Sequence, residues 1–319
     1  MRNEKALSAL LTDGIRFDPH YLPSMNSDHM PMTICAMAGL GATLEQIQEF
    51  TTGYSKILRP VTTVVSLSGV VNDQWRHWIG IPDGYAELLQ YFIETINLLG
   101  IDNTVSEYLP EFIDSLALDA FHPIIRLAYG INANSKEEVA ASLAYLITTH
   151  LSVPADSGKA CDLEEQLKTQ VAAGKVIEMK SFGDALVGLM RQERYPSGCA
   201  QDFKICARMS LGIYQSTRNF FALHMVTATY AVRICANYID SRRALGALTR
   251  ALLGAHLVVG SPDFDLSASA PVPKQLDLPH AYKYLYVCLQ EYQLYGDKRY
   301  LKEIADFKEM GLVPDWVNS

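Results

Sequence analysis

The stretch Leu278-Pro279-His280-Ala281-Tyr282-Lys283 begins the penultimate predicted helix and contains a pattern that recurs along the chain. A proline suits the first turn of a helix, because its φ is already helical and its missing N–H has no partner there. His280 and Lys283 are three residues apart and therefore lie on one helical face, among aromatic and apolar neighbours. Taken alone, the pair is typical of a core histidine with a hydrogen-bonded ring and a lysine that extends its ammonium to water. Histidines in similar settings elsewhere in the chain make a shared metal site the competing interpretation.

Helical patterns run through most of the chain. Capping boxes at Thr43/Gln46 and Ser135/Glu138 mark two helix starts, since each pair satisfies free backbone N–H groups. Asn26 or Ser27 is the expected N-cap of the helix over residues 30–40. Apolar periodicity and stop signals predict helices over residues 30–40, 43–58, 85–99, 104–118, 122–130, 136–150, 162–173, 182–194, 201–218, 219–238, 242–259, 279–295 and 298–310. The β-branched run 61–71 is the one plausible strand, and a single strand has no sheet to join. We therefore predict an all-α, multi-helical fold.

The composition favours one large folded unit. The chain has 319 residues, of which 49% are hydrophobic and 19% charged, so it can bury a sizeable core. Residues 151–160 form the best linker candidate, but segments with the histidine pattern come from both sides of it. We expect a single domain over residues 1–319, with a possible internal break at 151–160. The loop 260–273 is expected to be either a lid or a surface connection. The sequence does not predict the oligomeric state.

Charge and cysteine usage exclude several classes of protein. The net charge of -8 argues against nucleic acid or an anionic membrane as the main partner, because both need basic patches. None of the six cysteines forms a C-x-x-C pair, which removes the common zinc and dithiol patterns. The apolar stretches 6–11 and 252–259 are too short for a signal peptide core and a membrane span, respectively. A cytoplasmic protein is expected.

Four of the eight histidines are candidate metal ligands. His29, His122 and His280 each sit beside a proline at a predicted helix start, where the helix dipole keeps the imidazole neutral and able to bind metal. The same dipoles repel a cation, so a centre built from them needs an anionic ligand nearby. His224 lies in an apolar helix and must have a partner, such as the hydroxyl of Thr227 or Tyr230, or a metal. Taken together the set favours a metal site.

The remaining histidines and motifs are less informative. His20, His77 and His150 have polar neighbours and are expected to be ordinary surface or loop residues, while His256 is a reserve ligand. Gly39-Leu40-Gly41 lacks the third glycine of a dinucleotide fingerprint, and no P-loop, G-x-S-x-G or H-E-x-x-H motif is present. A flavin or nicotinamide bound in a standard way is therefore not expected.

Four blocks of the sequence resemble the questin oxidase-like family. They fall in the family's order and cover most of the chain: His29-x-Pro31-Met32; residues 121–130 (FHPIIRLAYG), continued by Glu138-Val139-Ala140; His224-Met225-Val226-Thr227; and His280-Ala281-Tyr282-Lys283, continued by residues 289–292 (LQEY). The resemblance implies an oxidative enzyme that acts on aromatic polyketides such as anthraquinones. Some members of this family have a further histidine at the position of Arg126 or Tyr129 in this chain. The choice of ligand within residues 121–130 is therefore open.

The family resemblance also implies a ligand set. It is that of a mononuclear non-haem Fe(II) oxygenase, with His29, His122, His224 and His280 as ligands and Lys283, carboxylated at its amine, as an anionic fifth. The alternative for Lys283 is an ion pair with Glu291 or Asp240. The expected partners are a small aromatic substrate and O2. The alternatives for the whole protein are an NADPH-linked Baeyer-Villiger oxidase, or a non-catalytic helical protein that binds an apolar ligand.

Overall fold

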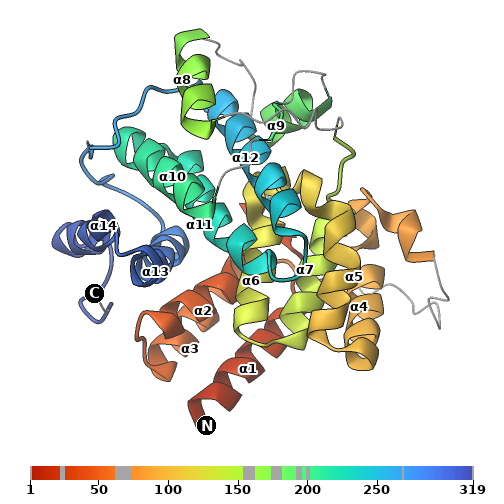
Figure 1. Ribbon diagram of the computed structural model, residues 1–319. Coiled ribbons are helices and arrows are strands. Elements are labelled where there is room, and N and C mark those ends of the chain that lie inside the picture. The colour runs from red at the N-terminus through yellow and green to blue at the C-terminus, as the bar shows by residue number, and fades with distance from the viewer. Residues whose placement is uncertain are drawn as a thin grey trace.

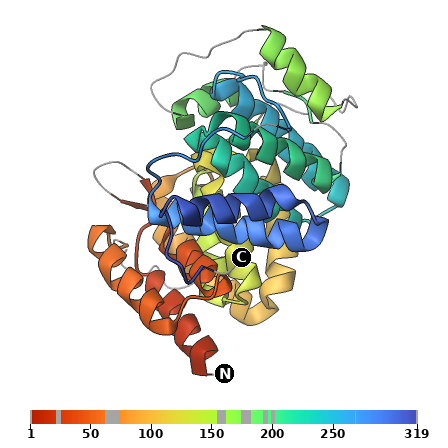
Figure 2. The ribbon, with the colours of Figure 1, turned by 90° about the vertical axis from the view of Figure 1, so that its left-hand side faces the viewer.

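Helices make up nearly all regular structure in the computed structural model, which describes residues 2–21, 26–61, 74–153, 162–173, 182–191, 196–198, 202–267 and 269–317. Figures 1 and 2 show them packed around a common interior. Within these residues the α-helices are α1 (Arg2–Gly14), α2 (Met30–Gly39), α3 (Leu44–Tyr54), α4 (Tyr85–Leu99), α5 (Ile101–Phe112), α6 (His122–Asn132), α7 (Lys136–Thr148), α8 (Leu163–Ala173), α9 (Phe182–Arg191), α10 (Phe203–Thr217), α11 (Phe220–Cys235), α12 (Ser241–Val258), α13 (Leu278–Tyr295) and α14 (Lys298–Glu309). The prediction of an all-α fold is confirmed.

Four helices from distant parts of the chain pack in a closed ring. α2 contacts α6, α6 contacts α11, α11 contacts α13, and α13 contacts α2 again (Figure 1). α7 and α10 cover the outside of the ring by packing on α6 and α11. α6 is buried over residues 122–130, where all residues except His122 and Arg126 are apolar, aromatic or small. Gly130 allows α7 to approach α6 closely, because a Cβ there would lie 3.1 Å from the carbonyl carbon of Glu138.

Several helix boundaries were predicted correctly and others were wrong. Thr43 and Gln46 form the capping box that begins α3, and Ser135 caps α7 by accepting from the N–H of Glu138. The helix expected at 104–118 begins earlier and ends at Phe112, with Pro110 inside it, because Gly100 makes the turn from α4. The N-terminal helix α1 was not predicted.

The strands are limited to one short hairpin in the described residues. β1 (His20–Tyr21) pairs antiparallel with β2 (Asn26–Ser27), with His20 opposite Ser27. Asn26 and Ser27 are therefore strand residues, and neither caps α2 as the sequence suggested. The expected extended run 61–71 lies outside the described residues from 62 onward, and so does the predicted break from 154 onward.

The loop after α12 is a surface connection. The side chain of Ser216 in α10 bonds the backbone of Asp265, and Arg218 donates to the carbonyl of Ala270.

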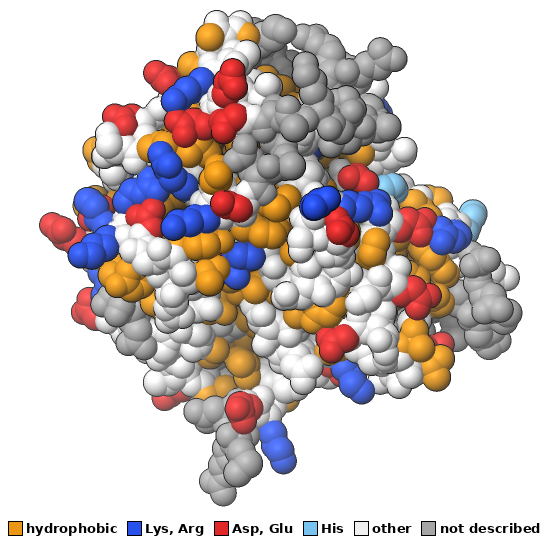
Figure 3. Space-filling model, in the orientation of Figure 1, with side chains coloured by type: hydrophobic (Ala, Val, Ile, Leu, Met, Phe, Trp, Pro, Cys, Tyr) orange, Lys and Arg blue, Asp and Glu red, His pale blue; other side chains and the backbone are white. Residues whose placement is uncertain are grey.

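Figure 3 shows acidic and basic side chains intermixed on the face that it displays. None of the helices in the described segments is long and apolar enough to cross a membrane.

Candidate metal centre

Each helix of the four-membered ring carries one histidine near its N-terminus. His29 is the N-cap of α2, His122 is the first residue of α6, His280 is the third residue of α13, and His224 is the fifth of α11. Prolines occupy the first turn of the first three helices, as the sequence indicated. Asn219 begins α11 instead, by accepting from the N–H groups of the next turn. The ring therefore brings four histidines and four helix N-termini to one place.

The four histidine rings form one buried cluster. Nε2 of His29 lies 2.9 Å from Nε2 of His122, and one ring nitrogen from each of His29, His122 and His280 lies within 4.8 Å of the others. The His224 ring centroid lies 4.9 Å from that of His122 and 5.1 Å from that of His280. All four residues are at most 7% exposed. The structure thus brings together every histidine that was predicted as a ligand.

Hydrogen bonds on the far side of the rings orient three of the four imidazoles. Nδ1 of His122 lies 2.6 Å from the carbonyl of Asp119, Nδ1 of His224 lies 3.2 Å from the carbonyl of Phe220, and Nδ1 of His280 lies 2.7 Å from the carboxylate of Asp277. Each Nδ1 is therefore the donor, and Nε2 keeps its lone pair. This is the arrangement found around metal-bound histidines, where an outer partner fixes the ring.

Two of the ring nitrogens on the inner side of the cluster have no hydrogen-bond partner among the described residues. Nε2 of His224 and Nε2 of His280 are buried and make no hydrogen bond to any described residue. A buried acceptor without a partner is costly, and a cation would satisfy it. The residues present therefore fit a metal ion.

Burial favours the neutral form of all four imidazoles. Burial, followed by the positive charge of Lys283, lowers the pKa of His280 to about 4. Burial lowers the pKa values of His29, His122 and His224 well below the usual range as well. Neutral imidazole is the form that binds metal.

Lys283 lies one helical turn after His280 and is 1% exposed. Burial lowers its pKa to about 7, against the opposing charges of Asp277 and Asp28. No hydrogen bond or ion pair joins its amine to a residue in the described ranges. The two carboxylates suggested as partners are engaged elsewhere, because Glu291 pairs with Arg233 at 2.6 Å and Asp240 caps α12.

Three other candidates are not ligands. Arg126 forms a buried ion pair with Glu138, and the hydroxyl of Tyr129 donates to the carbonyl of Lys283. His256 is bonded at both ring nitrogens, to the side chain of Gln170 and the carbonyl of Pro262. The expectation that His256 is a reserve ligand is therefore wrong.

A cavity of about 1010 Å³ opens beside the cluster, and all four histidines line it. Its apolar wall includes Phe220, Phe221 and Ile57. The Phe220 ring is 41% exposed, and its centroid lies 4.6 Å from that of His280. A flat apolar molecule could therefore reach the cluster.

Comparison with known proteins identifies the family of the chain. A family model described as Questin oxidase-like matches residues 26–197, which is more than half of the chain. The chain belongs to the questin oxidase-like family. Membership indicates an oxidoreductase. The matched segment contains His29 and His122, while His224 and His280 follow it. No curated protein matches the chain.

The wall of the larger cavity in this questin oxidase-like protein contains a polar pair, His20 and Asp119, that the sequence did not predict. Nε2 of His20 lies 2.7 Å from the carboxylate of Asp119, so the assignment of His20 as an ordinary surface residue was wrong. His150 lies in a loop, as expected, but it also lines the cavity. His77 is exposed, as expected for an ordinary surface residue. The spacing of three between Asp277 and His280 could have identified Asp277 as the partner of that ring, because its carboxylate bonds Nδ1 of His280.

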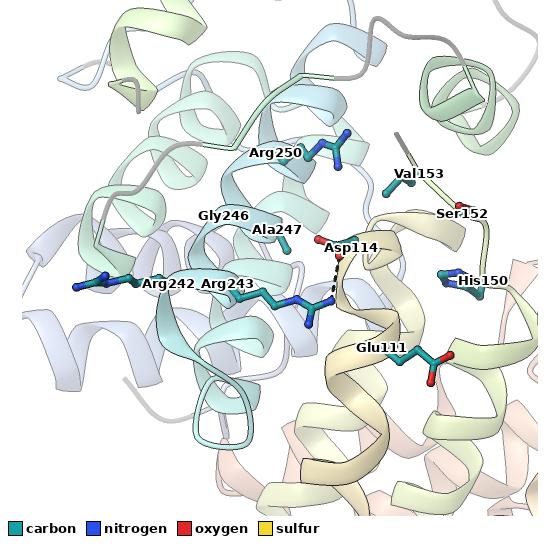
Figure 4. Close-up of a pocket in the computed structure, with 10 residues that line it drawn as sticks. All are labelled: Glu111, Asp114, His150, Ser152, Val153, Arg242, Arg243, Gly246, Ala247 and Arg250. Atoms are coloured by element: carbon teal, nitrogen blue, oxygen red, sulfur yellow. Dashed lines mark hydrogen bonds and ion pairs between the residues drawn. The ribbon is translucent and has the colours of Figure 1, made fainter. Parts of the chain in front are cut away.

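A smaller cavity of about 490 Å³ lies between α12 and the end of α5 (Figure 4). Arg242 and Arg250 line the cavity. Two of its acidic groups are paired: Asp114 with Arg243 at 3.3 Å, and Glu111 with Arg76, which lies outside the lining. These pairs are roughly half exposed and therefore weak. The larger cavity is the better candidate for the functional site.

Proposed function

We propose that this questin oxidase-like protein is an Fe(II)-dependent oxygenase that acts on flat aromatic, polyketide-like substrates such as hydroxylated anthraquinones. The observation that carries the proposal is a cluster of four buried histidines beside a large cavity, three of which (His29, His122 and His280) bring one ring nitrogen each within 4.8 Å of the others. Imidazole nitrogens suit iron among the first-row metals. Bound iron would supply the activation of dioxygen.

His29, His122 and His280 would hold the ion, since one ring nitrogen from each lies within 4.8 Å of the others. The Nε2 atoms of His29 and His122 are only 2.9 Å apart, so both could bind the same ion. His224 would join them from α11, where its ring centroid lies 4.9 Å from that of His122.

Lys283 would supply an anionic ligand, which the four imidazoles are not. The four imidazoles are neutral, and four helix N-termini direct positive partial charge at the cluster. A carboxylated Lys283 is an anion that can compensate for both. It forms when the neutral amine nitrogen attacks the carbon of CO2 and releases one N–H proton, which leaves a carbamate with a negative oxygen.

The cavity wall would hold the substrate. Phe220 and Phe221 offer ring faces for stacking, and their side chains lie at the start of α11, next to His224. The polar groups Ser27, Thr148 and Asp119 also line the cavity. An apolar wall with a few polar groups suits a polycyclic phenol.

Metal loading and oxygen uptake test the proposal together. Protein purified without an affinity tag and loaded anaerobically with ferrous ion is expected to retain about one equivalent of iron. With hydroxylated anthraquinones it is then expected to consume oxygen without added NADPH. Iron content and an oxygen electrode are the measurements. A requirement for NADPH would favour the Baeyer-Villiger alternative. Retention of less than about a tenth of an equivalent would instead favour a non-catalytic protein that binds an apolar ligand.

Replacement of Lys283 tests the anionic ligand. Lys283→Met keeps the volume of the side chain but has no amine, so iron affinity is expected to fall about 10- to 100-fold. Added bicarbonate is expected to raise the iron affinity of the wild type and to leave that of the variant unchanged. The surface variant Lys168→Met is the control, because that ammonium is 64% exposed. Full iron content in Lys283→Met would show that the lysine is structural.

A further inference from the structure

The histidine cavity contains a second ionisable pair that the metal centre does not use. Nε2 of His20, in β1, lies 2.7 Å from Oδ2 of Asp119, in the 3-10 helix η5 (Leu118–Phe121), and both residues line the cavity. The side chains are 14% and 34% exposed. They are therefore shielded but can still be reached by a molecule in the cavity.

The His20 ring is held in one orientation. The Tyr145 hydroxyl lies 3.4 Å from Nε2, and the Tyr145 ring meets the imidazole edge-on at 5.2 Å. Ser27 bonds the same hydroxyl at 2.8 Å, across the β1–β2 hairpin. The backbone N–H of His20 donates to the carboxylate of Asp18 at 3.0 Å. Among the residues that the structure describes, Asp18, Asp119 and Tyr145 are thus the titratable groups bonded to this histidine.

The hydrogen bond to Asp119 determines which nitrogen can react. Because Nε2 donates to the carboxylate, Nδ1 of His20 carries the lone pair. Nδ1 makes no hydrogen bond to a described residue, and it is not fully buried. A histidine with one nitrogen on a carboxylate and the other free is the arrangement of a general base.

Asp119 also fixes this base relative to the metal centre. Its carbonyl bonds Nδ1 of His122 while its carboxylate bonds His20. The residue is held in place by an unusual backbone, since Asp119, Ala120 and Phe121 have φ values of 48°, 51° and 68°. Non-glycine residues in this region cost roughly 1–3 kcal/mol each, and they cluster at functional sites.

We infer that His20 is the base that accepts the proton of a phenolic hydroxyl of the substrate, with Asp119 as its positioning residue. This inference rests on the proposed function and narrows its substrate class to phenols. The O–H bond breaks, the proton bonds to Nδ1, and the electron pair stays on oxygen. The products are a phenolate and an imidazolium that Asp119 stabilises. The phenolate ring is richer in electrons and therefore easier to oxidise.

Ionisation of a bound dye tests the inference without iron. Metal-free protein is titrated anaerobically with 1,8-dihydroxyanthraquinone, whose visible absorption distinguishes phenol from phenolate. At a given pH, the ratio of phenolate to phenol is expected to be at least about tenfold higher for bound than for free dye, because an adjacent imidazolium favours the anion. His20→Gln is expected to abolish this shift, and Asp119→Asn is expected to reduce it.

Two controls keep the test decisive. 1,8-Dimethoxyanthraquinone cannot ionise, so His20→Gln should bind it as tightly as the wild type if the cavity is intact. The variant His77→Gln changes an exposed histidine that does not line the cavity, and it should ionise the dye normally.

The possible outcomes separate this inference from the proposed oxygenase. A phenolate shift that persists in His20→Gln would overturn the role of His20, and so would a wild-type protein that does not shift the dye. A shift that depends on His20, in a protein that takes up no oxygen after ferrous loading, would support His20 and contradict the oxygenase.

Discussion

Replacement of His122 by alanine is expected to remove tightly bound iron and to lower oxygen uptake by at least about a hundredfold. The ring of His122 is in contact with those of His29, His224 and His280. It also bonds Asp119, so its loss removes one ligand and releases the segment that positions His20. Iron content after dialysis and the initial rate of oxygen uptake are the measurements.

The matched control for this prediction is His77→Ala, which changes an exposed histidine at no site. The unfolding midpoint of the metal-free proteins should be measured in parallel, since a folded variant without iron isolates the loss of the ligand. A His122→Ala protein that keeps its iron and its rate would exclude His122 from the centre.

Replacement of Arg126 by methionine is expected to lower the free energy of unfolding by about 3–5 kcal/mol, because it leaves a buried carboxylate without its partner. Nε of Arg126 donates to Glu138 at 2.8 Å, and the two side chains are 1% and 2% exposed. The pair joins α6 to α7, behind the segment that carries His122. Denaturant unfolding of the metal-free protein measures the loss.

Two further variants show whether the unpaired charge is responsible. Arg126→Met combined with Glu138→Leu should recover much of the lost stability, since an apolar pair can replace a buried ion pair. Lys168→Met breaks a largely exposed pair with Glu164 and should cost less than about 1 kcal/mol. A loss for Arg126→Met as small as that for Lys168→Met would contradict the proposed cost.

The sequence predicted what depends on neighbouring residues. The capping box at Thr43 was confirmed in full. At Ser135 only the N-cap bond was confirmed, because the side chain of Glu138 pairs with Arg126. The prolines beside His29, His122 and His280 correctly placed these histidines at helix starts. Such signals act within one helical turn, so a single sequence reveals them.

What the sequence missed depends on contacts through space. His20 was taken as a surface residue because its partner Asp119 is 99 positions away. His256 appeared equivalent to the ligands in its apolar helix, but packing of α12 against α8 brings Gln170 to its ring. The left-handed backbone at Ala120 has no signal either, since alanine does not favour that conformation.

The ring of four helices has a consequence for how the protein is made. Its histidines are spread from position 29 to position 280, so a growing chain has only part of the set until α13 leaves the ribosome. A centre that uses all four histidines therefore cannot form during most of translation. If the proposed iron binds there, its loading would be a late step that follows the docking of α13 onto α2 and α11.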